Sequence, residues 1–550
     1  MMIPKIYPLC ETAACVEFSD SIDGATHQQV MVLNKKIQHQ PFTGFIETVP
    51  SYTTLTFYYQ PEFINSINGS PFAFVKNYIE SLLSDLKSDS TKGKEVISIP
   101  VCYDDEFGYD LDFIASNSKL TKKQVIEIHQ QQVYDVYMMG FLPGFAYMGS
   151  VDDAIATARK STPRASVEEG SVGIAGKQTG IYPLKSPGGW QIIGRTPFCL
   201  FDLKKQDPFL FKTGDRVKFQ PISKDEFHKI KKEQLQVADI KEEQTIADTI
   251  VIKPGIYSTI QDAGRFGYQS YGVPISGAID QVAYHTANAL AGNEKNGACI
   301  ECTMGGLQLQ FKKNAVIAIT GAGAAYVNGQ LIRSWQPLSV SRADILEIRY
   351  NNDGLRTYIA VKGGFAANAI MNSRSVYAKA GIGAPLKKEE GLQFENLLSA
   401  NPKKITESLS VPTYNSEASI RIIAGPENHW MKAVSIQQIS SQPFTLSNQC
   451  DRMGYQLKAG SLLLNETKEL LSTAVTKGTI QLTPSGQLII LMSDCQTTGG
   501  YPRVAQVAAV DLPVLAQLKP GDTIRLHHIS FEEAEALYLV EQKKINDLFN

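Results

Sequence analysis

The sequence contains few cysteines and few histidines for its length. Eight residues of each type are scattered through 550 positions. This sparse distribution does not predict a disulfide framework or a histidine-based metal site. The one close pair, Cys299 and Cys302, forms a CxxC motif. No second CxxC and no nearby pair of histidines completes it, so we interpret both as buried or unrelated thiols and predict no metal site.

Targeting signals and long apolar runs are also missing. The start, Met1–Lys5, lacks the basic head and apolar stretch of a signal peptide. No run approaches the roughly 18 apolar residues of a membrane helix, and Gly140, Pro143 and Gly144 interrupt the richest candidate. We therefore expect a cytoplasmic protein. The formal net charge of −2 argues against nucleic acid as the main partner.

Standard nucleotide-binding and nucleophile motifs are absent from the sequence. The glycine-rich segment 170–179 resembles a Walker A loop, but its first glycine is misplaced and no Ser or Thr follows Lys177. There is no GxGxxG opening a helix, no HExxH and no GxSxG. Any nucleotide chemistry must therefore use a site without a common sequence signature.

The pattern of the chain indicates several β-rich domains on either side of a charged linker. The length predicts three to five units, since a domain usually has about 100–200 residues. Residues 223–248 are dense in Lys, Glu, Asp and Gln and read as a linker, helical over 224–235. We place a small α/β domain at 1–90, a β domain at 91–222 and further β domains at 249–550. Frequent turns between short strands favour closed or sandwiched β architecture over a doubly wound sheet.

Hydrophobic periodicity and capping residues predict particular elements. Helices are expected at 72–86, 121–132 and 280–291, the last with Asp280 as its cap and Gly292 as its end. Strands are expected at 15–18, 54–58, 315–320, 345–349, 358–361, 420–423 and 488–492.

The two halves share a similar series of turns. A Gly-Gly-aromatic turn, 188–190, precedes Gly214-Asp215 and a strand, and a second, 499–501, precedes Gly521-Asp522 and a strand. This repetition indicates duplicated barrels. The alternative is that Gly-Asp before a strand is simply a common turn.

Loops that combine Gly, Pro, Arg and aromatic residues are the remaining candidates for chemistry. Glycine allows a backbone to approach a ligand closely, and arginine binds carboxylate or phosphate with two donors. The ordinary alternative is a set of tight turns in which each arginine binds a neighbouring group. The loops are 140–147, 162–164, 186–190, 194–197, 261–267, 372–375, 451–455 and 494–502.

Taken together, the motifs of the two halves resemble a known pair of families. In the first half, His129 and segments 99–103, 107–108, 140–147, 163–164, 170–172, 180–183 and 186–197 resemble the KipI family, allophanate hydrolase subunit 1. In the second, segments 261–262, 277–280, 287–288, 292–293, 373–375, 451–455 and 496–502 resemble the KipA family, allophanate hydrolase subunit 2. The chain departs from the families at Cys10-Glu11, where Gly-Asp is usual, at Asn372, where Gly is usual, and near 383–391, where an arginine is missing.

This resemblance implies a mainly β fold with α/β additions: tandem cyclophilin-like β-barrels and a small N-terminal α/β domain. It also implies a fused subunit of ATP-dependent 5-oxoprolinase. Such a subunit opens 5-oxo-L-proline to L-glutamate with a LamB/YcsF-type partner, the A component of the enzyme, and is inactive alone. ATP with Mg²⁺ is the expected cofactor. No biotin is expected on this chain, because Met431-Lys432 lacks the usual Met-Lys-Met context.

Two other functions stay open at this stage. One is a KipI-type regulatory binding protein that acts on a histidine kinase. The other is the carboxyltransferase component of a biotin-dependent urea carboxylase-like system. The sequence also leaves open the oligomeric state, including a homo-oligomer, and which half binds ATP or 5-oxoproline.

The implied reaction needs cations for phosphate and carboxylate and an acid–base pair beside the lactam ring. For proton transfer we predict His129, Asp262, Asp280 and Asp451, with Tyr182 and Tyr501 as donors. For substrate or phosphate binding we predict Arg164, Lys177, Arg195, Arg265, Arg374 and Arg452, with Gly188, Gly189, Gly499 and Gly500. His129 has an alternative interpretation as a packing residue, because it lies in a predicted helix.

Overall fold

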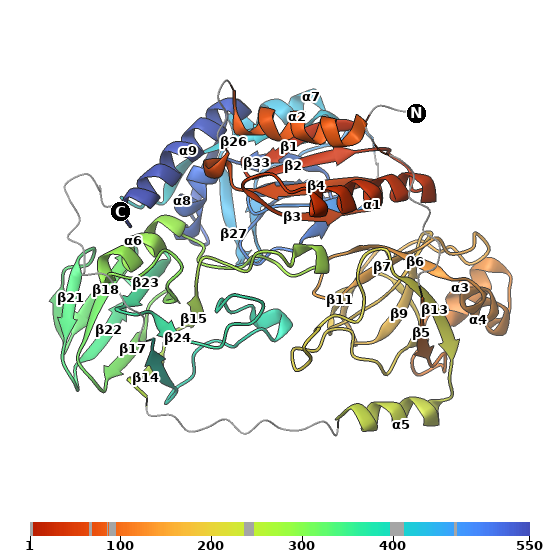
Figure 1. The fold of residues 1–550 in the computed structure, drawn as a ribbon, viewed down its shortest axis with the longest axis horizontal. Coiled ribbons are helices and arrows are strands. Elements are labelled where there is room, and N and C mark those ends of the chain that lie inside the picture. The colour runs from red at the N-terminus through yellow and green to blue at the C-terminus, as the bar shows by residue number, and fades with distance from the viewer. Residues whose placement is uncertain are drawn as a thin grey trace.

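The computed structural model describes residues 4–64, 69–84, 86, 95–235, 247–395, 412–466 and 470–550. An N-terminal α/β domain lies on a C-terminal barrel, in red and blue at the top of Figure 1. Two further β-structures lie below them, in orange to yellow on the right and in green on the left. The beginning and the end of the chain therefore form one layer.

The N-terminal domain is an antiparallel sheet, ordered β1-β2-β4-β3, with two helices on one face. Its elements are β1 (Lys5–Cys10), β2 (Ala13–Glu17), α1 (Gly24–His39), β3 (Phe45–Pro50), β4 (Thr54–Tyr59), η1 (Pro61–Phe63) and α2 (Pro71–Ser84). Val30, Leu33 and Val75 from the helices pack with Phe57 of the sheet in one core. The Asp23 carboxylate accepts from Thr26 N (2.8 Å) and fixes the start of α1. Both strands and the one helix predicted here are confirmed.

The second domain of the first half is a β-barrel. Its elements are β5 (Val96–Val101), α3 (Leu111–Ser118), α4 (Lys122–Gln131), β6 (Tyr134–Met139), β7 (Ala146–Gly149), β8 (Arg164–Val167), β9 (Ser171–Ala175), β10 (Gln178–Ile181), β11 (Ser186–Gly188), β12 (Gln191–Arg195) and β13 (Arg216–Pro221). The main sheet has the order β12-β9-β10-β7-β6-β13-β5. Cys102 and Arg195 exchange two backbone hydrogen bonds of 2.9 Å, which join its two edges. Helix α5 (Lys224–Leu235) follows where the charged linker was expected to be helical.

The first barrel of the second half consists of two packed sheets, ordered β20-β19-β22-β17-β14-β25-β24 and β15-β16-β23-β18-β21. Its elements are β14 (Thr249–Pro254), β15 (Tyr257–Gln261), η2 (Gln269–Tyr271), α6 (Gln281–Ala291), β16 (Cys299–Thr303), β17 (Leu307–Phe311), β18 (Ala315–Gly321), β19 (Ala324–Val327), β20 (Gln330–Ile332), β21 (Pro337–Val340), β22 (Ile345–Arg349), β23 (Arg356–Val361), β24 (Phe365–Ala366), η3 (Ala378–Ala380) and β25 (Gly391–Phe394). Helix α6 begins at the predicted cap, Asp280, whose carboxylate accepts from Ala283 N (2.9 Å), and ends at Gly292.

The C-terminal domain is a closed barrel in the order β26-β33-β30-β31-β28-β27-β34. Its elements are β26 (Glu417–Ala424), η4 (Asn428–Trp430), α7 (Ala433–Ser441), β27 (Phe444–Cys450), β28 (Gly454–Lys458), β29 (Thr473–Ala474), β30 (Thr479–Leu482), β31 (Leu488–Leu491), β32 (Thr498–Gly499), β33 (Arg503–Val507), η5 (Ala509–Asp511), α8 (Leu512–Gln517), β34 (Thr523–His528) and α9 (Phe531–Asp547). The predicted combination of tandem barrels with a small α/β domain is confirmed.

The barrel of the first half and the C-terminal barrel share one topology. In each, the first and last strands pair in parallel, β5 with β13 and β26 with β34, and the remaining neighbours follow in the same order. The turn before the last strand also matches: Asp215 Oδ2 accepts from Lys212 N (2.9 Å), and Asp522 Oδ2 accepts from Lys519 N (3.0 Å). The repeated turns noted in the sequence therefore lie at equivalent places in two barrels of the same design.

Polar contacts hold the N-terminal domain on the second half. The buried Glu47 carboxylate of β3 accepts from Gly267 N (2.8 Å) and Gln269 N (2.9 Å). Thr54 Oγ1 lies 2.9 Å from Thr473 Oγ1, at the opposite end of the sequence. Since a buried carboxylate without partners is costly, these contacts fix the position of the two halves.

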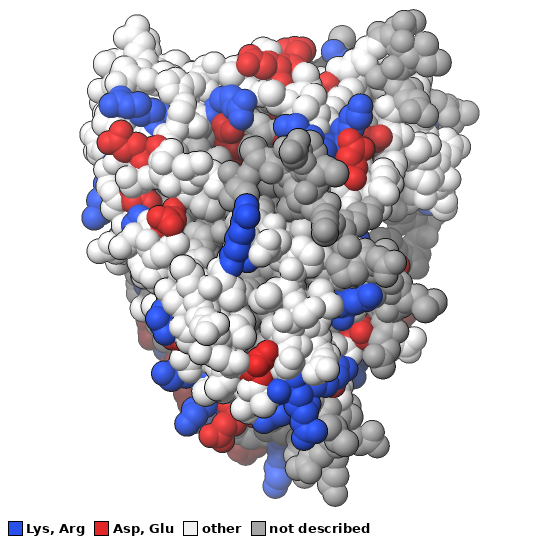
Figure 2. Space-filling view, turned by 90° about the vertical axis from the view of Figure 1, so that its left-hand side faces the viewer, with Lys and Arg blue, Asp and Glu red and all other residues white. Residues whose placement is uncertain are grey.

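The outer surface at the left of Figure 1 mixes charges of both signs. Figure 2 shows Lys and Arg interspersed with Asp and Glu over most of this face, with uncharged surface between them. Within the part of the chain that the structure describes, no helix is both long and apolar enough to cross a membrane.

Candidate functional site

A cavity of about 480 Å³ lies where the N-terminal domain, the first barrel of the second half and the C-terminal barrel meet. This volume is within the roughly 300–1,000 Å³ that small-molecule sites usually have. The N-terminal domain contributes Cys10, Glu11 and Tyr58 to the wall. Both halves of the chain are therefore needed to enclose this space.

Glu11 brings a carboxylate to the cavity from the turn after β1. Its side chain is 1% exposed, and Oε1 accepts from Ala509 N (2.8 Å) across the boundary between the halves. Oε2 has no hydrogen-bond partner among the described residues. Burial raises the pKa of this carboxyl group, and the Ala509 amide opposes the rise in part. A carboxyl group with a raised pKa and a free oxygen is suited to proton transfer.

Lys477 brings an ammonium group to the same cavity from the loop between β29 and β30. It is partly buried, and Nζ donates to Ile279 O (3.0 Å). Burial lowers the pKa of Lys477 to about 8, and the nearby Arg452 adds to this effect. Glu301, Asp280 and Cys495 act in the opposite direction. No carboxylate of the described residues forms an ion pair with Lys477, so the cavity contains an unpaired cation.

Among the other titratable groups in the wall, one histidine and two thiols are uncharged near neutral pH, and the wall also contains Glu62, Lys295 and Glu541. Burial lowers the pKa of His285 to about 3, so its imidazole is neutral. Burial raises the pKa of the Cys10 thiol to about 11 and that of Cys495 to about 12. Neither thiol is therefore activated as a nucleophile. Cys299 and Cys302, the CxxC pair, are buried and free and lie outside the cavity wall.

We expect the Lys477→Met substitution to stabilise the protein below pH 8. A group with a folded pKa near 8 and an ordinary pKa of 10.5 costs stability whenever it is charged in the folded state. Removing it should raise the free energy of unfolding by about 1–2 kcal/mol. This figure starts from about 1.4 kcal/mol per pKa unit and is reduced for the lost hydrogen bond and for solvent in the cavity. The gain shrinks between pH 8 and 10.5 and is absent above that range. Denaturant unfolding across this pH range measures the gain in stability, and Lys458→Met, at an exposed lysine, is the control. An equal effect of both substitutions would contradict the prediction.

In the first half, the predicted anion-binding residues have partners in their own barrel. Arg164 Nη2 pairs with Asp110 Oδ1 (2.6 Å). Lys177 pairs with Asp153 on the surface (2.6 Å), and Arg195 Nε donates to Glu169 O (2.7 Å). None of the three lies in the wall of the cavity, and their predicted role has no support from geometry.

His129 lies in the core of the first-half barrel. Its ring nitrogens lie 3.0 Å from Tyr103 Oη and 2.9 Å from Thr179 Oγ1, and it stacks on Phe219 at 4.6 Å. Burial lowers the pKa of His129 to about 3. This is the environment of a packing residue, and a substrate cannot reach the buried ring. Proton transfer by His129 stays a prediction.

Tyr182, Gly188 and Gly189 form part of the packing of the same barrel. Tyr182 is 1% exposed, and burial raises the pKa of its phenol. A Cβ on Gly188 would lie 2.4 Å from Tyr182 Oη, so this glycine makes room for the ring. The Gly189 carbonyl accepts from Lys160 N (2.7 Å). Close packing and a backbone hydrogen bond, rather than ligand approach, account for these residues.

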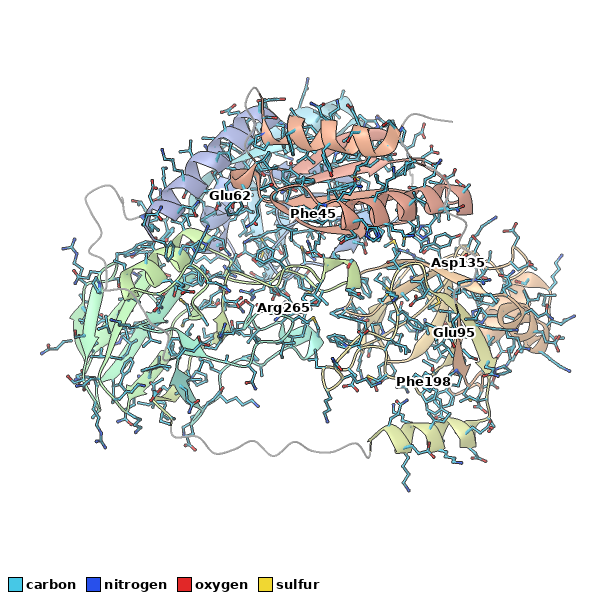
Figure 3. All side chains as sticks on the ribbon, in the orientation of Figure 1. Phe45, Glu62, Glu95, Asp135, Phe198 and Arg265 are labelled. Atoms are coloured by element: carbon cyan, nitrogen blue, oxygen red, sulfur yellow. The ribbon has the colours of Figure 1, made fainter. Side chains whose placement is uncertain are left out.

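In the second half, Asp262 and two predicted arginines organise one loop system. The Asp262 carboxylate accepts from Ser373 Oγ (2.7 Å), Arg374 N (2.7 Å) and Gly264 N (2.9 Å). Arg265 donates through Nε to Ile370 O (3.0 Å), and the Arg374 guanidinium pairs with Glu395. Figure 3 shows Arg265 near the centre of the molecule, where the barrels approach one another. These side chains fix loops next to the cavity without reaching its wall.

Arg452 and Asp280 belong to the junction between the two barrels of the second half. Arg452 is 7% exposed, pairs with Asp494 (Nε to Oδ2, 2.9 Å) and also contacts Glu301. Besides capping α6, Asp280 accepts from Gln517 Nε2 (2.8 Å), and burial raises the pKa of its carboxyl group. Both residues join elements that are distant in sequence.

Asp451 and Tyr501 line a second, open groove of about 440 Å³ on the C-terminal barrel. Asp451 pairs with Lys379 (2.8 Å), and Tyr501 is 43% exposed. A Cβ on Gly499 would lie 2.6 Å from Gln481 Nε2, and Gly500 borders Leu470 O. The structure therefore brings these four predicted residues to one region, which adjoins the interdomain cavity at Gln496, a residue in the wall of both.

None of the predicted site side chains lies in the cavity wall, but two of the predicted loops do. Segment 261–267 contributes Ala263 and Phe266, and segment 494–502 contributes Cys495 and Gln496. Sequence reasoning missed Glu11 and Lys477 as site residues. The sequence contained a signal for Glu11: at Cys10-Glu11 the chain departs from the usual Gly-Asp but still has an acidic residue at the second position.

Comparison with known proteins places this architecture in a family. The model of carboxyltransferase domain, subdomains C and D, matches residues 4–211, and that of subdomains A and B matches residues 271–528. The solved structure of TTHA0988 is 29% identical and has a TM-score of 0.81, covering 94% of this chain and 99% of that one.

Curated relatives match in the same way. The 5-oxoprolinase B subunit of Bacillus subtilis is 41% identical over 237 residues, which cover 97% of that protein and 42% of this chain. The 5-oxoprolinase C subunit of Escherichia coli is 35% identical over 289 residues, 92% of that protein and 52% of this chain. Urea amidolyase of Lachancea kluyveri is 29% identical over 316 residues, only 17% of its length. The chain belongs to the carboxyltransferase-domain family. Within this family, the first half is similar to a B subunit of 5-oxoprolinase and the second half to a C subunit. A fused arrangement of two such parts fits the length of each match.

Proposed function

We propose that this chain provides the fused B and C parts of an ATP-dependent 5-oxoprolinase. It opens 5-oxo-L-proline to L-glutamate together with a LamB/YcsF-type partner, the A component. The observation that carries the proposal is the shared cavity, in which Glu11 of the first half and Lys477 of the second face one enclosed space. The relatives named as B and C subunits of 5-oxoprolinase support the choice of reaction.

The chemistry of the lactam explains the need for these two side chains. An unstrained five-membered lactam resists attack by water, and phosphorylation of its oxygen by ATP activates it. The oxygen attacks the γ-phosphorus, the bond to ADP breaks, and the ring N–H proton passes to Glu11. Water then adds to the carbon, and the C–N bond breaks as the nitrogen gains a proton. Hydrolysis of the resulting acyl phosphate gives glutamate and phosphate. Lys477 supplies a positive charge for the anionic substrate in the same cavity.

ATP and Mg²⁺ would enter together, since Mg²⁺ is usually held by substrate phosphates and one or two carboxylates. Among the residues that the structure describes, no group of three or more His, Cys, Asp or Glu side chains is arranged to hold a metal ion. A preformed protein cage for the ion is therefore not part of the proposal.

Reconstitution tests the proposal. We expect the purified chain, mixed with a LamB/YcsF-type partner, to release ADP and form glutamate only when 5-oxo-L-proline is present. Each protein alone, and the mixture without 5-oxo-L-proline, are the controls. Carboxyl transfer from carboxybiotin without any 5-oxo-L-proline-dependent ADP release would overturn the proposal and favour the urea carboxylase-like function instead.

A further inference from the structure

Two buried hydroxyl groups in the cavity wall have no hydrogen-bond partner among the described residues. Ser276 and Ser493 are each 4% exposed, and both line the cavity. The Oγ atom of each is without a partner. Ser276 N donates to Ser493 O (3.1 Å), so the two residues lie side by side. Buried hydroxyls are normally hydrogen-bonded, and an adjacent pair without partners therefore indicates a place for a ligand.

The backbone at Ser276 adds a second observation. Its φ is 56°, in the left-handed region that side chains other than Gly, Asn and Asp rarely adopt. Neighbouring hydrogen bonds maintain this conformation: Arg265 N donates to Ile275 O (2.7 Å), and Ala278 N donates to Asp262 O (3.0 Å). Strained residues held in this way are concentrated at ligand sites. The backbones of Asp262 and Arg265 thereby hold the Ser276 turn.

Lys477 adds a positive charge to the wall of the same cavity. It forms no ion pair among the described residues, although Glu301 and Asp280 lie near enough to affect its charge. Both of these carboxylates have other partners, since Glu301 binds Arg452 and Asp280 caps α6. An unpaired, partly buried ammonium group is costly, and a bound anion would remove that cost.

We propose that Ser276, Ser493 and Lys477 form a subsite that binds the carboxylate of a small cyclic-amide substrate. Two hydroxyl donors and one ammonium group match the two oxygens of a carboxylate. Glu11, which enters from the other half, is then left for the amide group. The identity of the amide rests on the proposed function, but the recognition of a carboxylate does not. The subsite selects lactams that carry a carboxylate over neutral lactams of the same size.

Chemical labelling of Lys477 tests this subsite without relying on activity. Acetic anhydride modifies neutral lysines, and mass spectrometry measures the rate at Lys477 in the full chain with its LamB/YcsF-type partner at pH 8. A carboxylate bound beside the ammonium group keeps it protonated and covered. We expect 5-oxo-L-proline to slow the reaction at Lys477 at least about fivefold, because at pH 8 a rise of one unit in the lysine pKa from about 8 lowers its neutral fraction by about that factor. The neutral analogue 5-oxo-L-prolinamide should have little effect.

The Ser276→Ala/Ser493→Ala double substitution should abolish most of this protection, whereas Ser485→Ala, on an exposed turn, should not. The exposed Lys458 serves as an internal control for reagent reactivity. Equal protection by the acid and the amide, unchanged protection in the double variant, or no protection by any carboxylate would overturn the subsite. Protection by propionate or glutamate without 5-oxo-L-proline-dependent ADP release would support the subsite and count against the proposed lactam reaction. Release of ADP without protection of Lys477 would support the proposed lactam reaction and count against the subsite.

Discussion

The Glu11→Gln substitution is expected to lower kcat for 5-oxo-L-proline-dependent ADP release by about 100-fold or more, the usual cost of removing a general base. Glutamine has nearly the same volume, and its amide oxygen can still accept from Ala509 N, as Glu11 Oε1 does at 2.8 Å. It cannot take up the lactam N–H proton. KM should change little, because the carboxylate of the substrate is bound by the other half of the cavity. The measurement is steady-state kinetics of the reconstituted complex at saturating ATP.

Two further variants make this result interpretable. Glu11→Asp restores the acidic residue usual in the KipI family and should keep a large part of the activity. Glu17→Gln, in the adjacent strand β2, removes a carboxylate of the same domain outside the cavity and should have no effect. A Glu11→Gln enzyme with wild-type kcat would remove Glu11 from the mechanism. A fall in kcat accompanied by loss of thermal stability would indicate a structural role instead.

Local signals in the sequence predict the elements of this fold well. The α6 helix illustrates this, because Asp280 and Gly292 are its cap and its end, and both are visible within a short segment. The Gly-Asp turns at 214–215 and 521–522 likewise appear at equivalent positions of two matching barrels. Helices α1 and α9 were not predicted, although Asp23 and Ser530 cap them. Few of their residues are buried, and tertiary packing rather than a strong periodic pattern fixes them.

The candidate site is predicted less well, because its properties come from residues distant in sequence. Arg452 looks like an anion-binding residue until Glu301, 151 positions earlier, is seen to pair with it. Conversely, nothing near Lys477 in the sequence shows that it lacks a carboxylate partner. Glu11 acquires its raised pKa from burial under a segment 498 positions later. Charge pairing and desolvation are set by the assembled domains, whereas capping and turns are set by neighbours along the chain.

The buried ion network around Arg452 provides the largest expected effect on stability. The Arg452→Met substitution leaves Glu301 and Asp494, which are 1% and 6% exposed, without their shared cation. Removing one member of a buried ion pair typically costs about 3–5 kcal/mol, since the remaining charge stays desolvated. Arg195→Met is the matched control: this arginine is partly exposed and donates to a backbone oxygen, so its removal should cost less than about 0.5 kcal/mol.

The distribution of tryptophans allows this loss to be located. The chain has three, Trp190, Trp335 and Trp430, and one lies in each barrel. Variants that retain a single tryptophan report the denaturant unfolding of one barrel at a time. Arg452→Met should shift the transitions seen by Trp335 and Trp430, because the network joins their barrels, and should leave that of Trp190 nearly unchanged. Adding Glu301→Gln should recover part of the loss, since it removes one unpaired charge. A uniform shift at all three tryptophans would mean that the halves unfold as one unit. In that case the contacts of Glu11 and Glu47 across the boundary, rather than the linker, hold the cavity together.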